Sequence, residues 1–144
     1  MSNYGIRGLA NDWFQNYLNS REQYVNFNNV LSNRCKITTG VPQGSILGPL
    51  LFLLYINDIC GSSRLLRFIL YADDTNIFYS GENLDQLCAT VNSELRGVMQ
   101  WFNTNRLSVN LKKTNFVMFG SPSKIRKLRK CEIFLDNINI SRTN

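Results

Sequence analysis

Tyr71-Ala72-Asp73-Asp74 lies between two short apolar stretches, residues 65–70 and residues 75–79. These stretches predict a β-hairpin with the two aspartates at its tip. Adjacent carboxylates repel each other, and neither aspartate is followed by the glycine that a tight two-residue turn prefers. A hard divalent cation would relieve this repulsion, because Mg²⁺ binds carboxylate oxygens and shares them with substrate phosphates. The pattern therefore indicates a metal-binding hairpin, and an exposed acidic turn is the purely structural alternative.

A second element, Gly40-Val41-Pro42-Gln43-Gly44, precedes the apolar segment 45–58. One proline and two glycines break regular structure, so this element is predicted to be a loop. Ser45 is a candidate N-cap for a helix over about residues 46–59, with Pro49 in its first turn. This helix is apolar nearly all round and is therefore expected to be buried.

Residues 40–58 followed by Tyr71-Ala72-Asp73-Asp74 closely resemble the reverse transcriptase of non-LTR (LINE-like) retrotransposons. Residues 107–114, Leu-Ser-Val-Asn-Leu-Lys-Lys-Thr, resemble the next motif of that family. Residues 5–18 are similar to the helix that precedes the Pro-Gln-Gly loop. Group II intron and telomerase-type polymerases share parts of this layout, but segment 45–58 is more similar to the non-LTR group.

The resemblance implies that Asp73 and Asp74 bind the two Mg²⁺ ions of nucleotidyl transfer, with Asp73 as the direct ligand. Such ions would bridge the primer hydroxyl and the incoming triphosphate. Tyr71 would lie beside the primer end, or would be a buried aromatic residue that supports the hairpin. Lys113 matches the position that neutralises or protonates the leaving pyrophosphate, although an ordinary surface lysine is the alternative. Asp58 is interpreted as a structural partner rather than a metal ligand.

The Pro42-Gln43-Gly44 loop would contact the templating base pair, where a small residue allows close approach of the backbone. The alternative is a turn-and-cap role alone. The implied partners are an RNA template, a DNA primer, deoxynucleoside triphosphates and the remainder of the retrotransposon polyprotein. No membrane partner is expected, and the implied location is intracellular, in the nucleus.

The family also carries an earlier Asp-bearing strand, a primer-gripping hairpin and a helical thumb, and none of these is expected within residues 1–144. The chain is therefore predicted to be a partial palm domain of α+β class, an antiparallel sheet packed on helices and truncated at both ends. The expected function is RNA-directed DNA polymerase, inactive as this isolated chain. The alternative is a non-catalytic remnant that only binds nucleic acid.

Composition agrees with one folded domain, because 44% of the 144 residues are hydrophobic and 12% are aromatic. The longest uninterrupted apolar run, residues 50–56, is far shorter than the roughly 20 residues that cross a bilayer. The chain has no histidine and no Cys-x-x-Cys pair, which argues against zinc sites and imidazole-based hydrolases. Its four cysteines are predicted to be free core thiols in a reducing compartment.

The formal charge of +6 is concentrated near the C-terminus, since residues 121–144 alone carry +4. A basic segment can neutralise phosphates and release counterions, so nucleic-acid contact is predicted there. A solvated connector without a partner is the alternative. Most of this charge comes from five residues of the basic segment, Lys124, Arg126, Lys127, Arg129 and Lys130.

The remaining segments alternate between helix and strand patterns. Apolar residues at helical spacing over 6–18 predict a helix with one buried face. Asn83, with Gln86 three residues later, is a capping-box variant that begins a second amphipathic helix reaching about residue 102. Strand patterns cover residues 25–38 as a hairpin, residues 115–119 as one strand, and residues 131–140 as a hairpin that turns at Asp136-Asn137.

Overall fold

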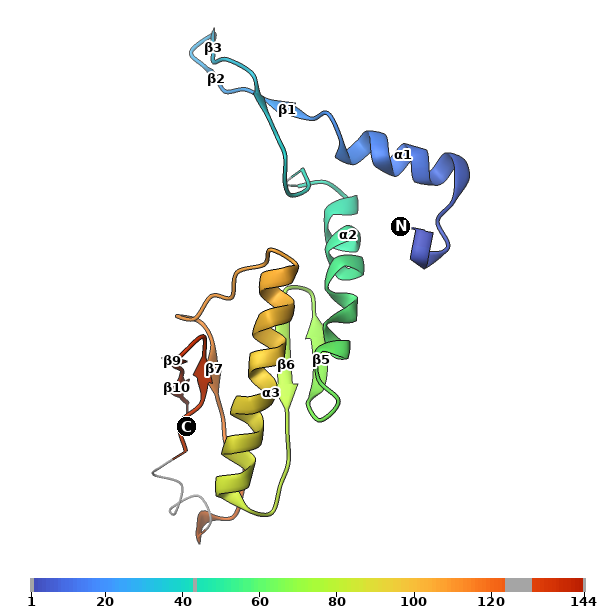
Figure 1. Cartoon of the computed structure of the whole chain (residues 1–144). Helices are drawn as coiled ribbons and strands as arrows, with labels where there is room; N and C mark the ends of the chain where they lie inside the picture. The colour runs from blue at the N-terminus through green and yellow to red at the C-terminus, as the bar shows by residue number, and fades with distance from the viewer. Residues whose placement is uncertain (1, 43, 124–130, 144) are drawn as a thin grey trace. The chain divides into compact units, whose positions relative to one another are not determined.

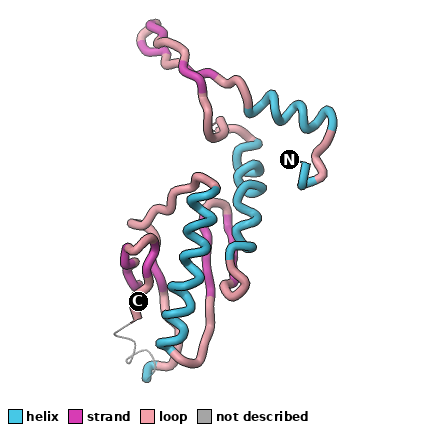
Figure 2. The backbone as a smooth tube through the Cα atoms, in the orientation of Figure 1, coloured by secondary structure: helices cyan, strands magenta, loops and turns pink. Residues whose placement is uncertain are grey.

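The computed structural model describes residues 2–42, 44–123 and 131–143, and it divides the chain into two compact units, Met1–Leu50 and Leu51–Asn144 (Figure 1). Helices and short strands alternate along the described residues (Figure 2). The predicted α+β class is therefore confirmed. The described strands form five two-stranded sheets rather than one continuous sheet, and only the β7–β10 pair is parallel. No helix in the described ranges has both the length and the apolar character needed to span a membrane.

The first unit begins with a 3₁₀-helix, η1 (Ser2–Tyr4), and helix α1 (Gly8–Leu18). The predicted hairpin follows as two short strand pairs. The outer pair is β1 (Glu22–Gln23) with β4 (Cys35–Lys36), and the inner pair is β2 (Asn26–Phe27) with β3 (Val30–Leu31). Asn28 and Asn29 make the turn at φ values of 48° and 63°, which asparagine tolerates better than most residues.

Helix α1 has the predicted position, but its predicted burial is wrong. No residue of α1 is buried, and Leu9 is 90% exposed. The apolar face is instead organised by its own aromatic rings, since Trp13 stacks on Tyr17 at 5.3 Å and meets Phe14 edge-on at 5.2 Å. Of the described hydrophobic side chains in this unit, none is buried.

Helix α2 (Leu47–Ile56) starts at the predicted cap, because the backbone N–H of Gly48 donates to Ser45 Oγ at 3.0 Å. It continues as the 3₁₀-helix η2 (Asn57–Ser62). The helix is only partly buried: Leu51 and Ile56 are covered, while Leu53 and other apolar residues of its sequence are exposed. The expectation of a fully buried helix is therefore wrong.

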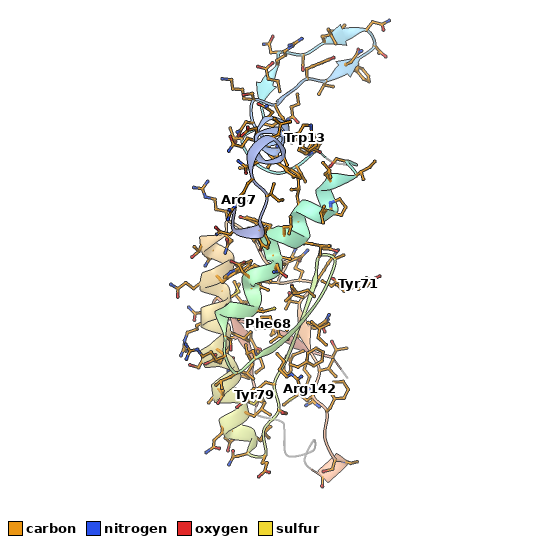
Figure 3. The ribbon with its side chains drawn as sticks, turned by 90° about the vertical axis from the view of Figure 1, so that its right-hand side faces the viewer. Arg7, Trp13, Phe68, Tyr71, Tyr79 and Arg142 are labelled. Atoms are coloured by element: carbon orange, nitrogen blue, oxygen red, sulfur yellow. A yellow bond between two sulfur atoms is a disulfide. The ribbon has the colours of Figure 1, made fainter. Side chains whose placement is uncertain are left out.

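Helix α3 (Leu84–Thr104) is the longest described element of the second unit. Its predicted cap is confirmed, because Asn83 Oδ1 accepts the backbone N–H of Gln86 at 3.2 Å. The helix lies along one side of the strands, including the β5 (Arg67–Tyr71) and β6 (Asp74–Phe78) hairpin (Figures 1 and 3). Its apolar stripe enters a core formed by Ile56, Ile59, Leu66, Leu95, Val98, Met99, Ile133, Leu135 and Ile140.

Polar contacts attach α3 to the segments on either side of it. Ser63 Oγ donates to Glu94 Oε2 at 2.6 Å and accepts the backbone N–H groups of the two residues that precede β5, Leu65 at 3.1 Å and Leu66 at 3.0 Å. The Asn92 side chain donates to the Glu132 carbonyl and accepts the Phe134 N–H, both at 2.9 Å. The side-chain amide of Asn92 thus forms one donor and one acceptor hydrogen bond with the backbone at the start of β8, like the paired bonds between antiparallel strands.

The C-terminal strands are β7 (Asn115–Phe116), β8 (Phe134–Leu135), β9 (Ile138–Asn139) and β10 (Ser141–Arg142). The predicted hairpin is confirmed in β8 and β9, which are joined by Asp136-Asn137. Strand β7 is shorter than the predicted strand over 115–119.

The cysteine prediction is wrong, because Cys88 of α3 and Cys131 are joined by a disulfide with Cα atoms 6.0 Å apart. The two remaining thiols, Cys35 and Cys60, are free but exposed rather than buried in a core. The disulfide lies one helical turn from Asn92, so covalent and hydrogen-bonded attachments hold the same end of β8 to α3.

The disulfide predicts a measurable stability difference. A bridge between residues 43 apart restricts the unfolded chain, and such bridges contribute about 2–4 kcal/mol. Replacing Cys88 and Cys131 together with serine should lower the free energy of unfolding by that amount in non-reducing urea titrations.

The matched control replaces the exposed Cys35 and Cys60 with serine, which should change the free energy of unfolding by less than about 0.5 kcal/mol. Thiol titration of the urea-unfolded chain should find two reactive thiols before reduction and four after it. Four reactive thiols before reduction would contradict the pairing.

Candidate active site

The β5–β6 hairpin is confirmed, with a tip that differs by one residue from the predicted one. Tyr71 pairs directly with Asp74, so Ala72 and Asp73 form a two-residue turn and Asp74 begins β6. Only one of the two aspartates therefore lies in the turn itself. The turn lies toward the same end of this unit as the C-terminal end of α3 (Figures 1 and 3).

The backbone at this turn is strained. Ala72 has a φ of 51°, a left-handed value that costs a residue with a Cβ about 1–2 kcal/mol. Two-residue hairpin turns require positive φ at their first central position and usually place glycine there. Backbone strain of this kind concentrates at functional sites, where the surrounding structure enforces it.

The hairpin has one packed face and one open face. Phe68, Leu70, Ile77 and Tyr79 pack against the core around α3. The opposite face carries Arg67, Ile69, Tyr71, Asp74, Asn76 and Phe78, and all of these side chains are exposed. Two of them, Ile69 and Phe78, are apolar, so this face presents hydrophobic surface to solvent.

Tyr71 and Asp74 occupy directly opposed positions on the open face, so their side chains are cross-strand neighbours. Tyr71 is 78% exposed, and Figure 3 shows its ring directed away from the ribbon. The interpretation of Tyr71 as a buried support for the hairpin is therefore wrong. Its ring is available to a ligand that approaches Asp74.

The carboxylates of Asp73 and Asp74 are both exposed. Neither makes an ion pair in the described part of the chain, where Arg34 and Glu22 form the one such pair at 3.6 Å. Adjacent carboxylate oxygens are ligands that Mg²⁺ accepts, so this pair fits part of a magnesium shell. Across residues 2–42, 44–123 and 131–143, no group of three or more Asp, Glu, Cys or His side chains is placed to hold a metal ion.

Lys113 lies in a tight turn after α3 rather than in a pocket. The Asn110 carbonyl accepts the backbone N–H groups of Lys113 at 3.0 Å and Thr114 at 3.1 Å. The Lys113 side chain is exposed, and within the described ranges it forms no ion pair with Asp73 or Asp74. The hairpin and this lysine belong to the same unit, but the described contacts do not join them.

Pro42 and Gly44 belong to the first unit, where Gly44 has a φ of 79° and open space around its α-carbon. Gln43 lies outside the described residues, as do Lys124, Arg126, Lys127, Arg129 and Lys130. The predicted loop over residues 40–44 is confirmed for its described members.

Asp58 does not have the predicted structural role. It lies in η2, is exposed, and makes neither a hydrogen bond nor an ion pair with any described residue. It lines a hollow together with Ser62 and Trp101, two residues that the sequence patterns did not single out.

Comparison with known proteins identifies the family to which the chain is similar. The model of the family "Reverse transcriptase (RNA-dependent DNA polymerase)" matches residues 2–136. The chain is 26% identical over 137 residues to the probable RNA-directed DNA polymerase from transposon X-element of Drosophila melanogaster, covering 90% of this chain and 14% of that protein.

Two further relatives come from the same organism. The probable RNA-directed DNA polymerase from transposon BS is 31% identical over 69% of this chain and 12% of its own length. The RNA-directed DNA polymerase from mobile element jockey is 25% identical over 74% of this chain and 12% of its own length. The chain thus spans a small part of each relative, and no solved structure matches it.

The family match covers nearly the whole chain and includes the loop, the hairpin and the turn after α3. The chain therefore belongs to the reverse transcriptase family and is homologous to the RNA-directed DNA polymerases of non-LTR retrotransposons.

Proposed function

We propose that this chain supplies the palm-type, metal-binding part of an RNA-directed DNA polymerase. The observation that carries the proposal is the Asp73-Asp74 pair on a strained, exposed hairpin in a chain of the reverse transcriptase family. Asp73 in the turn is the direct metal ligand, and Asp74 adds carboxylate oxygens at the start of β6. Bound Mg²⁺ would stabilise charge on the transferring phosphoryl group.

The remaining residues hold the substrates. Tyr71 lies beside Asp74 on the open face, where its ring supports the primer end. Lys113 offers a positive charge to the leaving pyrophosphate, and Pro42, Gln43 and Gly44 contact the templating base pair. The substrates are an RNA template, a DNA primer and deoxynucleoside triphosphates, and the site of action is the nucleus.

We further propose that the 144 residues alone do not polymerise DNA. Two-metal phosphoryl transfer uses ions about 3.5–4 Å apart that clamp the attacking and leaving oxygens. Asp73 and Asp74 come from a single hairpin, and the described residues add no third ligand nearby. In a complete polymerase of this family, a further Asp-bearing strand would pair beside this hairpin and supply the additional carboxylate.

The test is primer extension on an RNA template with Mg²⁺ and four deoxynucleotides. The isolated chain is compared with a chimera in which it replaces the matching segment of the jockey polymerase. Extension is expected only from the chimera. Asp73→Asn in the chimera should reduce the rate more than about 100-fold, because several kcal/mol of charge stabilisation are removed.

Asp136→Asn, in the β8–β9 turn, is the matched control and should leave extension unchanged. A soluble chimera that holds primer and template without extending it would contradict the catalytic proposal. Extension by the isolated chain that Asp73→Asn abolishes would contradict the proposed inactivity.

Nucleic-acid binding without catalysis is the second candidate, and the +4 charge of residues 121–144 favours it. Phosphate contacts by Lys124, Arg126, Lys127, Arg129 and Lys130 would make affinity fall steeply with salt and depend little on sequence. Such binding is compatible with the polymerase proposal and becomes the whole function only if the chimera is inactive.

The salt dependence of binding to single-stranded RNA tests this role of the basic segment. Replacing the five basic residues with glutamine should flatten the slope of log K against log salt by up to about 0.7 for each phosphate that is no longer neutralised. Replacing the exposed Arg64, Arg96 and Arg106 with glutamine is the control and should change the slope less. An unchanged slope in the five-residue variant would show that the segment is only a solvated connector.

A further inference from the structure

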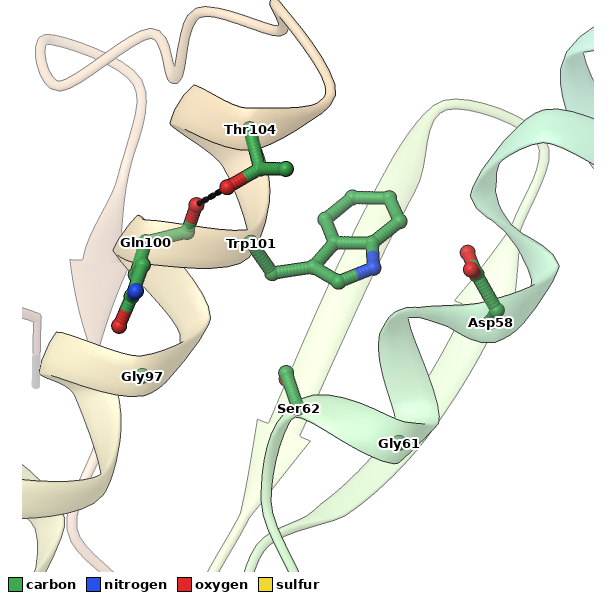
Figure 4. A pocket seen from close by; sticks show the side chains of 7 residues that line it. All are labelled: Asp58, Gly61, Ser62, Gly97, Gln100, Trp101 and Thr104. Atoms are coloured by element: carbon green, nitrogen blue, oxygen red, sulfur yellow. Dashed lines mark hydrogen bonds between the residues drawn. The ribbon is translucent and has the colours of Figure 1, made fainter.

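A hollow of about 420 Å³ lies between η2 and α3 in the second unit, in the size range of ligand sites. Asp58, Gly61 and Ser62 line it from η2, and Gly97, Gln100, Trp101 and Thr104 line it from α3 (Figure 4). The two elements approach closely at its floor, where a Cβ on Gly97 would lie 3.1 Å from the Ser62 carbonyl oxygen. Neither the family match nor the proposed polymerase chemistry assigns a role to this hollow.

Two polar groups around the hollow lack partners among the described residues, the Asp58 carboxylate and Ser62 Oγ. The Asp58 carboxylate faces the edge of the Trp101 indole across the hollow (Figure 4). Ser62 Oγ is the buried one of the two, and no described residue forms a hydrogen bond with it. Thr104 is different, because its hydroxyl donates to the Gln100 carbonyl at 2.8 Å. The Asp58 carboxylate is exposed and has no cationic partner among the described residues, so it is open to a ligand that carries positive charge.

The arrangement selects a planar cation. The carboxylate attracts positive charge, and the partly exposed indole face attracts cations and stacks with flat groups. A guanidinium has both properties, since it is planar, permanently charged and carries several N–H donors for the Asp58 carboxylate. A stacked nucleobase is less suitable, because no lysine or arginine lines the hollow to neutralise the phosphate that a nucleotide brings.

We infer that the hollow between η2 and α3 binds an arginine side chain presented by another polypeptide segment, with Asp58 as its ion-pair partner and Trp101 as its stacking surface. The site is a docking point for a basic protein surface rather than for substrate. It does not depend on the Asp73-Asp74 hairpin, so it can be tested whether or not the chain polymerises DNA.

The test follows the Trp101 indole N–H resonance by NMR while a blocked tripeptide, acetyl-Gly-Arg-Gly-amide, is added at low salt. The Trp13→Phe variant of the full chain leaves Trp101 as the one remaining tryptophan. A saturable shift is expected, with a dissociation constant in the millimolar range, roughly 1–10 mM. The citrulline tripeptide, which lacks the charge, should bind about fivefold more weakly or worse.

Asp58→Asn should weaken arginine-tripeptide binding by the same factor, and Asp58→Glu should restore most of it. Asp136→Asn removes an equal charge in the β8–β9 turn and should leave binding unchanged. A dispersed Trp101 resonance in each variant shows that the core around this residue is folded, because Trp101 packs against that core.

Equal binding of the arginine and citrulline tripeptides, or binding that Asp58→Asn leaves unchanged, would overturn the inference. A single-stranded RNA that shifts Trp101 and is not displaced by the arginine tripeptide would instead assign the hollow to a nucleobase. Absence of any saturable shift up to about 20 mM tripeptide would show that the hollow is not a binding site.

Discussion

The packing of α3 is the constraint on which the second unit depends. Leu95, Val98 and Met99 are buried against residues from η2, β8 and the segments beside the hairpin. The polar attachments of Ser63 and Asn92, and the Cys88–Cys131 bridge, hold the same neighbours at fixed positions along the helix. Because the hairpin begins just after Ser63 and packs one face on this core, α3 determines where its carboxylate-bearing end lies.

The features that sequence predicted correctly depend on local chemistry. Asn83 and Ser45 cap their helices through hydrogen bonds to backbone groups three residues away, so short patterns suffice to recognise them. The Asn28-Asn29 and Asp136-Asn137 turns follow from side chains that tolerate positive φ. The Asp73-Asp74 pair is likewise visible as a sequence pattern, because its unusual charge density does not require knowledge of the packing.

The features that sequence missed depend on contacts between distant segments. The apolar stripe of α1 predicts a buried face, but burial needs a partner surface, and the described part of its unit does not provide one. The Cys88–Cys131 bridge and the parallel β7–β10 pair join residues far apart in the chain. The exposure of Tyr71 depends on the register of the hairpin. Tyr71 pairs with Asp74, which places its ring on the open face, and a shift of one residue would turn it to the other face.

The two acidic sites of this basic chain differ in charge and in surroundings, and they therefore suit different cations. Asp73 and Asp74 are adjacent and exposed beside the strained residue Ala72, so their repulsion is relieved best by a compact divalent ion that accepts several oxygens. Asp58 is a single carboxylate beside an indole, a geometry that offers one negative charge and one flat apolar face. A hydrated divalent ion gains little from the indole, whereas a guanidinium gains from both groups. The same side chain type thus suits different cations because its neighbours differ.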